Sequence, residues 1–202
     1  MAKSALHLAR MSYQPKMPAS LQGAVKIIEG KATEAVSDKE EIAAIFPRTY
    51  GLPLISFAPG GERTEYPPTN VGVILSGGQA PGGHNVIAGL FDEMKLLNPD
   101  SRLFGFLMGP DGLIEHKYRE LTAEVIDEYR NTGGFDMIGS GRTKLDKPEQ
   151  FEAGLEILRE LDIKALVIIG GDDSNTNACI LAEYYASIEA GIQVIGCPKT
   201  ID

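Results

Sequence analysis

Two adjacent acids stand where the sequence predicts a phosphate-binding turn. In "IGGDDSNTNA", residues 169–178, an apolar run ends at Gly170 and Gly171, and a predicted helix follows. The free N–H groups at a helix start attract anions, yet Asp172 and Asp173 are themselves anions. A single aspartate there could simply cap the helix. Two in succession favour a hard cation shared with a phosphate, because Mg²⁺ binds one or two carboxylates plus substrate phosphates.

A second glycine-rich turn lies earlier in the chain, in "VILSGGQAPGGHN" at 73–85. A predicted strand runs into Gly77 and Gly78, and a helix follows. Glycine permits positive φ and a close approach of the backbone to a phosphate. The spacing matches neither a P-loop nor the dinucleotide fingerprint. A tight turn without a ligand is the alternative for this unit alone, and His84 is interpreted as a polar residue at the helix start.

The segment "CPKTID" (197–202) places three reactive side chains after another predicted strand. Lys199 supplies charge for a transferring phosphoryl group, and Thr200 supplies a hydroxyl. Asp202 is a possible base for a substrate hydroxyl. Taken alone, a Pro-Lys-Thr sequence after a strand is also compatible with an ordinary loop.

A glycine- and serine-rich loop, "GSGRTK" at 139–144, carries Arg142. A guanidinium on such a loop is suited to contact phosphate oxygens. A solvated surface arginine is the alternative interpretation of this residue.

From about residue 69 onward, short apolar runs alternate with helical periods. We predict strands at 71–76, 101–109, 164–171 and 191–199, a short strand within 135–143, and helices at 81–97, 122–130, 148–161 and 173–190. Such alternation indicates an α/β fold with a mostly parallel sheet and helices on both faces. Ligands bind such sheets outside the carboxyl ends of the strands, which is where every segment described above is expected to lie.

The first 68 residues have weak periodicity, so we interpret 1–68 as an irregular or helical N-terminal extension and 69–202 as the α/β domain. The extension holds one predicted helix, with Ser37 as N-cap and Glu40 completing a capping box. Its apolar face would consist of Ile42, Ala43, Ile45 and Phe46.

Composition excludes several classes of protein. The net charge of −9 disfavours non-specific binding to nucleic acid or to an anionic membrane. The chain has neither an 18-residue apolar run nor a secretory apolar segment at its start, so a cytoplasmic protein is expected. The two cysteines, Cys179 and Cys197, are interpreted as buried reduced thiols.

Taken together and in order, "SGGQAPGGHN", "GSGRTK", "GGDDSNTNA" and "PKTID" resemble the phosphofructokinase family, and most closely its pyrophosphate-dependent, long-chain branch. The resemblance covers residues 71–202. It implies a phosphofructokinase-like α/β fold, the Rossmann-like half of the enzyme. It also implies reversible phosphoryl transfer from pyrophosphate (PPi) to the 1-hydroxyl of fructose 6-phosphate, with Mg²⁺, in glycolysis. A homo-oligomer, a dimer in the full-length protein, would be the working form.

The resemblance also implies roles for single residues. Gly78 would contact PPi through its backbone N–H, and Asp172 would hold Mg²⁺. Arg142 would be a phosphate-site residue. Thr200 would touch the sugar side, and Asp202 would take the hydroxyl proton as the catalytic base.

Donor choice is implied at two further positions. ATP-using members of the family have glycine where Asp173 stands, and usually glycine where Lys199 stands. The Asp173 carboxylate would therefore repel a nucleotide α-phosphate, and Lys199 would help to neutralise PPi. An unpaired like charge aimed at the wrong substrate is a general route to specificity.

In the family, the final motif continues with Asn-Asp and at least as many residues again. We therefore expect this sequence to be an N-terminal, donor-site portion, incomplete at its C-terminus and with little turnover by itself. Two other interpretations stay open: an ATP- or NAD-type kinase, and a non-catalytic phosphate-binding fragment.

Overall fold

The computed structural model describes residues 4–21, 23–60 and 65–199, which belong to two compact units. One unit joins the residues up to Ser12 with those from Tyr66 onward, and the other is Tyr13–Glu65. The division after residue 68 expected from the sequence stays a prediction. The first helix, α1 (Ala5–Ser12), groups with the larger unit, where the Asn131 side-chain amide donates to the Arg10 carbonyl at 2.8 Å.

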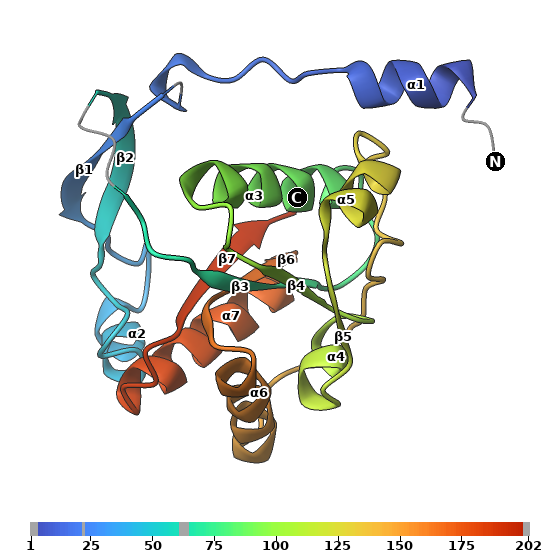
Figure 1. Ribbon diagram of the computed structural model, residues 1–202. Helices are drawn as coiled ribbons and strands as arrows, with labels where there is room; N and C mark the ends of the chain where they lie inside the picture. The colour runs from blue at the N-terminus through green and yellow to red at the C-terminus, as the bar shows by residue number, and fades with distance from the viewer. Residues whose placement is uncertain (1–3, 22, 61–64, 200–202) are drawn as a thin grey trace. The chain divides into compact units, whose positions relative to one another are not determined.

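A five-stranded sheet forms the centre of the larger unit, in the order β5-β4-β3-β6-β7 (Figure 1). Neighbouring strands among β4, β3, β6 and β7 pair in parallel, and β5 joins β4 antiparallel. The strands are β3 (Asn70–Leu75), β4 (Leu103–Phe106), β5 (Tyr118–Glu120), β6 (Ile163–Gly170) and β7 (Gln193–Pro198). The predicted fold class is thereby confirmed.

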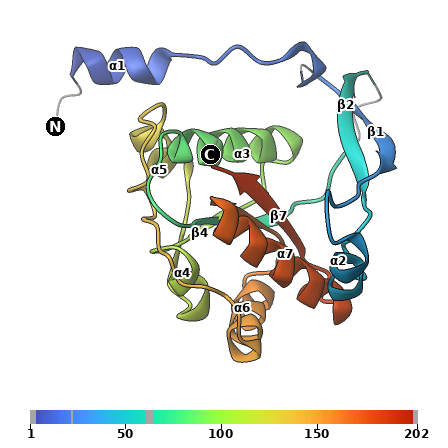
Figure 2. The same cartoon turned by 180° about the vertical axis from the view of Figure 1, so that it is seen from behind.

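Helices cover both faces of this sheet (Figures 1 and 2). One face carries α3 (Gly83–Leu97) and α5 (Ala123–Tyr129). The other carries α4 (Pro110–Ile114), α6 (Pro148–Glu160) and α7 (Asp172–Ser187). Because both faces are covered, the central strands are apolar almost throughout, and every residue of β3 after Asn70 is buried.

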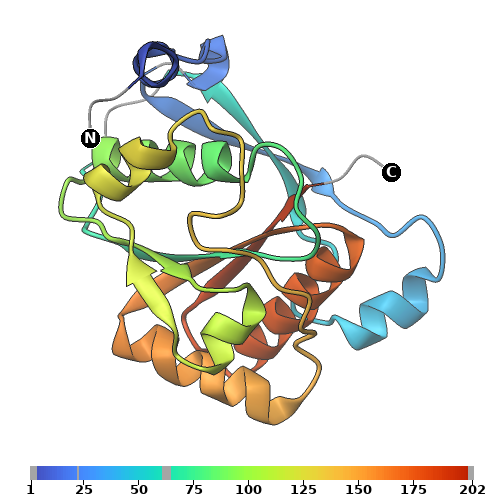
Figure 3. The same ribbon diagram turned by 90° about the vertical axis from the view of Figure 1, so that its right-hand side faces the viewer.

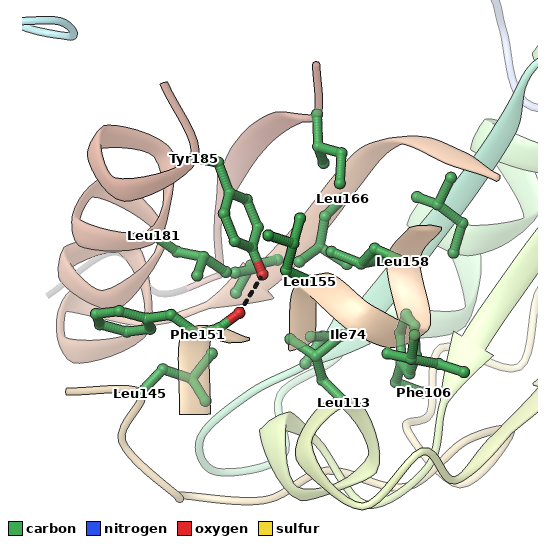
Figure 4. Close-up of a cluster of buried hydrophobic side chains, with 14 of the residues drawn as sticks. Ile74, Phe106, Leu113, Leu145, Phe151, Leu155, Leu158, Leu166, Leu181 and Tyr185 are labelled. Carbon is green, nitrogen blue, oxygen red and sulfur yellow. Dashed lines mark hydrogen bonds between the residues drawn. The ribbon is translucent and has the colours of Figure 1, made fainter. Parts of the chain in front are cut away.

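Alternate residues of the strands divide the core into two clusters. Val73 and Leu75 face α3 and α5, whereas Ile74 and Leu166 face α6 and α7. Figure 4 shows the second cluster, where the fully buried Tyr185 donates its hydroxyl to the Phe151 carbonyl at 3.3 Å. Burial raises the pKa of the Tyr185 phenol, so this hydroxyl stays protonated and serves the packing of α7 on α6.

The smaller unit contains an antiparallel pair of strands, β1 (Val25–Ala32) and β2 (Pro53–Pro59), with a 3-10 turn at Ala19–Leu21 and the helix α2 (Lys39–Ile45). The predicted capping box is wrong. Asp38, with a φ of 53°, is the N-cap and makes no side-chain capping bond, while the Ser37 hydroxyl bonds the Asp38 carboxylate at 3.0 Å. The apolar face is partial, because Ile45 is exposed.

Three predictions about the larger unit need correction. The short strand expected within 135–143 is a turn, and only Gly141 makes an isolated bridge, to Ser76. The strand expected at 101–109 is shorter than predicted, because β4 begins at Leu103 and ends at Phe106. The helix expected from Pro81 begins at Gly83, because Gly82 takes the left-handed conformation (φ 104°) and interrupts the helical backbone.

The cysteines also differ from expectation. Cys179 is exposed and Cys197 is half-buried, so the predicted burial of both thiols is wrong. Partial burial raises the pKa of the Cys197 thiol, which keeps it protonated near neutral pH. In the described ranges, no helix combines the length and apolar character that crossing a bilayer requires.

Replacing a core leucine tests the layered packing. Leu166 of β6 is fully buried among the side chains of Figure 4. We expect Leu166→Ala to lower the free energy of unfolding by about 2–5 kcal/mol, because it leaves a cavity. The control Leu96→Ala removes a side chain of α3 that is 60% exposed, and should change stability by less than about 0.5 kcal/mol. Urea unfolding measures both, and equal effects would contradict the core assignment.

Candidate functional site

The carboxyl ends of β3, β6 and β7 enclose a pocket of about 510 Å³. Its lining includes all the described residues that the sequence singled out for phosphate chemistry: Gly78, Arg142, Asp172, Asp173 and Lys199. Segments 121 residues apart in the chain therefore meet at one edge of the sheet, as expected for a parallel α/β fold. Thr200 and Asp202 lie outside the described residues. The individual roles assigned to these side chains stay predictions.

The glycine-rich turn after β3 is held from both sides. The Ser76 N–H donates to the Ile169 carbonyl of β6, and the Gly77 N–H donates to the Gly141 carbonyl, each at 2.8 Å. Gly77 has a φ of 84°, a conformation that favours glycine. In the part of the chain that the structure describes, the N–H of Gly78 has no protein acceptor. This amide is therefore available to an anion at the pocket wall.

The start of α7 forms the opposite wall. Gly171 is the N-cap, so the N–H groups of Asp172, Asp173 and Ser174 have no carbonyl within the helix to bond. The Ser174 hydroxyl instead turns back and donates to the Ser76 hydroxyl at 2.8 Å, and both residues are buried. A Cβ on Gly170 would lie 2.2 Å from the Ser174 Cβ, so only glycine admits this approach.

The two acids of this wall are exposed at its mouth. Across the described ranges, neither the Asp172 nor the Asp173 carboxylate lies within 4 Å of a cationic side chain. Nor do three metal-ligating side chains gather anywhere in those ranges, so the described residues contain no preformed metal cage. Two hard carboxylates beside open amides fit a Mg²⁺ ion that takes its remaining ligands from phosphate and water.

Two cations approach the pocket from other segments. The Lys199 ammonium donates to the Gly78 carbonyl and lies 5.6 Å from the centroid of the Phe135 ring. The Lys199 backbone N–H donates to Gly170 at 2.9 Å, which fixes the chain directly after β7. The Arg142 guanidinium lies against Gly78, since an added Cβ there would stand 3.1 Å from Nη2. The guanidinium makes no ion pair or hydrogen bond within the described residues, so its donors are available to phosphate.

Arg142 is carried by the long connection between α5 and α6, which Figure 3 shows running between these helices in yellow to orange. The connection is packed backbone against backbone, since a Cβ on Gly141 would lie 2.2 Å from the Met108 carbonyl oxygen. Further along, the Leu145 N–H donates to the Asn177 side chain of α7 at 3.1 Å. The arginine is thus placed by the fold and not by a free loop.

Sequence reasoning missed four residues around the pocket. The first three are the serine pair Ser76 and Ser174, and Phe135 below Lys199. The fourth is His84, which lies at the start of α3 as interpreted from the sequence, but whose side chain is completely buried. Burial lowers the pKa of His84, with a smaller opposing effect of the Asp136 carboxylate. Its partners lie about fifty residues away, so the local sequence held no signal for it.

Comparisons with known proteins identify relatives of this chain. The family model described as phosphofructokinase matches residues 70–202. The chain is 50% identical, over 98% of its length and 35% of the relative's, to pyrophosphate–fructose 6-phosphate 1-phosphotransferase subunit beta 1 of Arabidopsis thaliana. It is 46% identical to the pyrophosphate–fructose 6-phosphate 1-phosphotransferase of Treponema pallidum, over 100% of this chain and 37% of that one. The chain thus spans little more than a third of these relatives.

Solved structures show the same fold. A pyrophosphate-dependent phosphofructokinase of Nitrosospira multiformis superimposes with a TM-score of 0.60 at 22% identity, covering 66% of this chain and 34% of that one. Another, of Marinobacter aquaeolei, gives a TM-score of 0.58 at 22% identity, covering 65% and 33%.

A substitution at Gly141 tests the packing that places Arg142. Gly141→Ala should destabilise the protein by about 1–3 kcal/mol, because its Cβ has no space beside the Met108 carbonyl. The matched control is Gly89→Ala, where an added Cβ meets nothing within 4 Å and the α3 helix should gain about 0.5–1 kcal/mol. Urea unfolding compares the two, and a Gly141→Ala protein as stable as the parent would contradict the packing described.

Proposed function

The chain belongs to the phosphofructokinase family, and from this premise we propose that the protein transfers a phosphoryl group reversibly between PPi and the 1-hydroxyl of fructose 6-phosphate. One observation carries the proposal. The pocket is lined by two carboxylates that have no ion pair within the described residues, by two cationic side chains, and by open backbone N–H groups. That combination suits a compact, highly charged phosphate donor better than it suits a larger neutral ligand.

The glycine-rich wall binds the donor. The open N–H of Gly78 and the Arg142 guanidinium beside it supply hydrogen-bond donors to phosphate oxygens. The Lys199 ammonium, next to the same turn, neutralises further charge on PPi. Phosphoryl transfer depends mainly on such positioning and charge stabilisation, because the protein itself makes no covalent bond to the group transferred.

Asp172 holds the metal in this proposal. Its carboxylate lies in the first turn of α7, exposed to the pocket and without an ion pair to any described residue. When bound there with a phosphate, Mg²⁺ would offset the charge that develops on the transferred group. The role of the chain is to supply a carboxylate ligand beside backbone N–H groups that donate to the same phosphate.

Asp173 selects the donor. Its exposed carboxylate lies at the pocket mouth, and no cationic side chain in the described part of the chain forms an ion pair with it. A like charge placed there costs a nucleotide donor several kcal/mol, whereas PPi has no α-phosphate to be repelled. This argues against the ATP-type alternative. The NAD-type alternative is disfavoured by the absence of the dinucleotide fingerprint in 73–85.

The roles that we propose on the sugar side of the site rest on the sequence motif "PKTID" at residues 198–202. Thr200 contacts the sugar phosphate, and Asp202 accepts the proton of the attacking hydroxyl, in this proposal. The same proposal places the reaction in glycolysis, in the cytoplasm, and in a homo-oligomer. The plant relatives that the chain matches are named as subunits, which supports an assembly of several chains. A non-catalytic phosphate-binding role is the second reading, and absence of turnover in the full-length protein would favour it.

Removing the proposed metal ligand tests the mechanism. We expect Asp172→Asn to lower PPi-dependent turnover at least about a hundredfold, with partial recovery at raised Mg²⁺, because one ligand of the ion is lost. The control is Glu149→Gln, which removes an acid from the first turn of α6, outside the pocket. A coupled assay on the full-length protein measures both. Turnover of Asp172→Asn equal to that of the control would overturn the assignment.

Donor selection has its own test. The double variant Asp173→Gly, Lys199→Gly should use PPi poorly and gain measurable turnover with ATP, because the repelling and the neutralising charge are both removed. Asp173→Asn separates charge from shape, and should relax donor preference while keeping a polar side chain at the helix start. The readout is the ratio of kcat/KM for PPi to that for ATP. If Asp173→Gly and Asp173→Asn both leave this ratio unchanged, the exclusion argument fails.

A further inference from the structure

The connection that carries Arg142 is fastened to the start of α3 by a series of backbone contacts. The Gly82 N–H donates to the Gly133 carbonyl at 2.8 Å, and the His84 N–H donates to the Gly134 carbonyl at 3.0 Å. The contact is close, since a Cβ on Gly83 would stand 2.5 Å from the Phe135 ring. Residues 133–135 therefore lie directly against the helix start that follows the glycine-rich turn.

The His84 side chain completes this fastening with both of its ring nitrogens. The Met137 N–H donates to Nε2 at 2.9 Å. A backbone N–H can only donate, so Nε2 is unprotonated and the proton of the neutral ring is on Nδ1. Nδ1 in turn donates to the Thr132 hydroxyl at 2.5 Å, and that hydroxyl donates to the Tyr129 carbonyl at 2.6 Å. One buried imidazole thus holds both ends of the segment 132–137.

Both cations of the pocket depend on that segment. Phe135, between the two anchored ends, presents its ring to the Lys199 ammonium. Beyond Met137, the chain continues through Ile138, whose carbonyl accepts from the Met108 N–H at 2.8 Å, to Gly141 and Arg142. The imidazole itself touches neither cation and does not line the pocket.

We infer that His84 is a positioning residue of the donor site: its neutral imidazole clamps residues 132–137 onto the start of α3 and thereby sets the places of Arg142 and Lys199. The inference rests on the proposed function. Loss of the His84 imidazole should weaken the binding of PPi more than the binding of fructose 6-phosphate, because only the wall that binds PPi is displaced.

Acid should release this clamp. A protonated His84 would carry hydrogen on both nitrogens, so Nε2 could no longer accept from Met137. The Asp136 carboxylate, 3.3 Å from Nε2, would receive that proton's hydrogen bond instead. The other ionisable group at the ring is Tyr129, which packs edge-on from α5 with ring centroids 4.9 Å apart. Because burial lowers the pKa of His84, the clamp is complete above the ordinary histidine pKa of about 6.5 and is lost as the pH falls through the lowered value.

Two conservative variants separate the two bonds. His84→Gln keeps an acceptor oxygen within reach of the Met137 N–H, whereas His84→Asn reaches only as far as the Thr132 hydroxyl. We expect His84→Asn to raise KM for PPi at least about tenfold and to change KM for fructose 6-phosphate by less than about twofold. We expect KM for PPi of His84→Gln to lie close to the parental value. His116→Asn is the matched control, since that histidine bonds the Ala153 carbonyl away from the pocket and Asn tolerates its left-handed φ of 56°.

The measurement is steady-state kinetics of the full-length protein from pH 5.5 to 8, together with amide hydrogen exchange of residues 132–142. As the pH falls, KM for PPi should rise more in the parent protein than in His84→Gln. Amide exchange in residues 132–142 should be faster in His84→Asn than in the parent. A folded His84→Asn with a parental KM for PPi would overturn the inference. If that variant does not fold, identical pH profiles of the parent and His84→Gln would overturn it. Should the parent itself lack PPi turnover, the proposed function fails, and the exchange data still decide whether the clamp exists.

Discussion

The site depends on the parallel pairing of β3 with β6, in which Ile74 stands beside Ile168 and Leu75 beside Ile169. This register ends both strands at the same height, so that the Ser76 N–H bonds Ile169 and the Ser76 hydroxyl meets Ser174 across the gap. The glycine-rich turn and the start of α7 are thereby held face to face. β7 pairs with β6 in the same direction and places Lys199 between them.

The charged side chains of the pocket determine which ligands this arrangement of strands and turns can bind. A pocket built only of helix-start amides and cations would accept many anions. Asp172 and Asp173 place two acids at the mouth. We propose that a phosphate is favoured there only together with a cation, and that a long polyphosphate chain is repelled by the second charge. In the function that we propose, the adjacent carboxylates at this anion site have two separate roles, metal recruitment by Asp172 and exclusion of a nucleotide by Asp173.

Much of this could be predicted from the sequence, because the signals are local. Apolar runs such as 164–171, which ends in a Gly-Gly turn, predicted the strands. Parallel topology then required Gly78, Asp172 and Lys199 to lie together at one edge of the sheet. The segment from 131 to 143 could not be predicted in this way. Its apolar residues resemble a strand, yet Phe135 and Met137 are buried by contacts with α3 and His84, more than fifty residues earlier. The Asp38 cap was missed because Ser37 and Asp38 are both favoured N-cap residues, so side-chain type did not decide between them.

We propose that the pocket accepts PPi through a metal and rejects a nucleotide by charge. Calorimetric titration of the full-length protein with PPi and with ATP, each with and without Mg²⁺, tests it most directly. We expect tight binding of PPi only when Mg²⁺ is present, and ATP binding weaker by at least about a hundredfold. Equal affinities for PPi and ATP, or PPi binding that is indifferent to Mg²⁺, would contradict it.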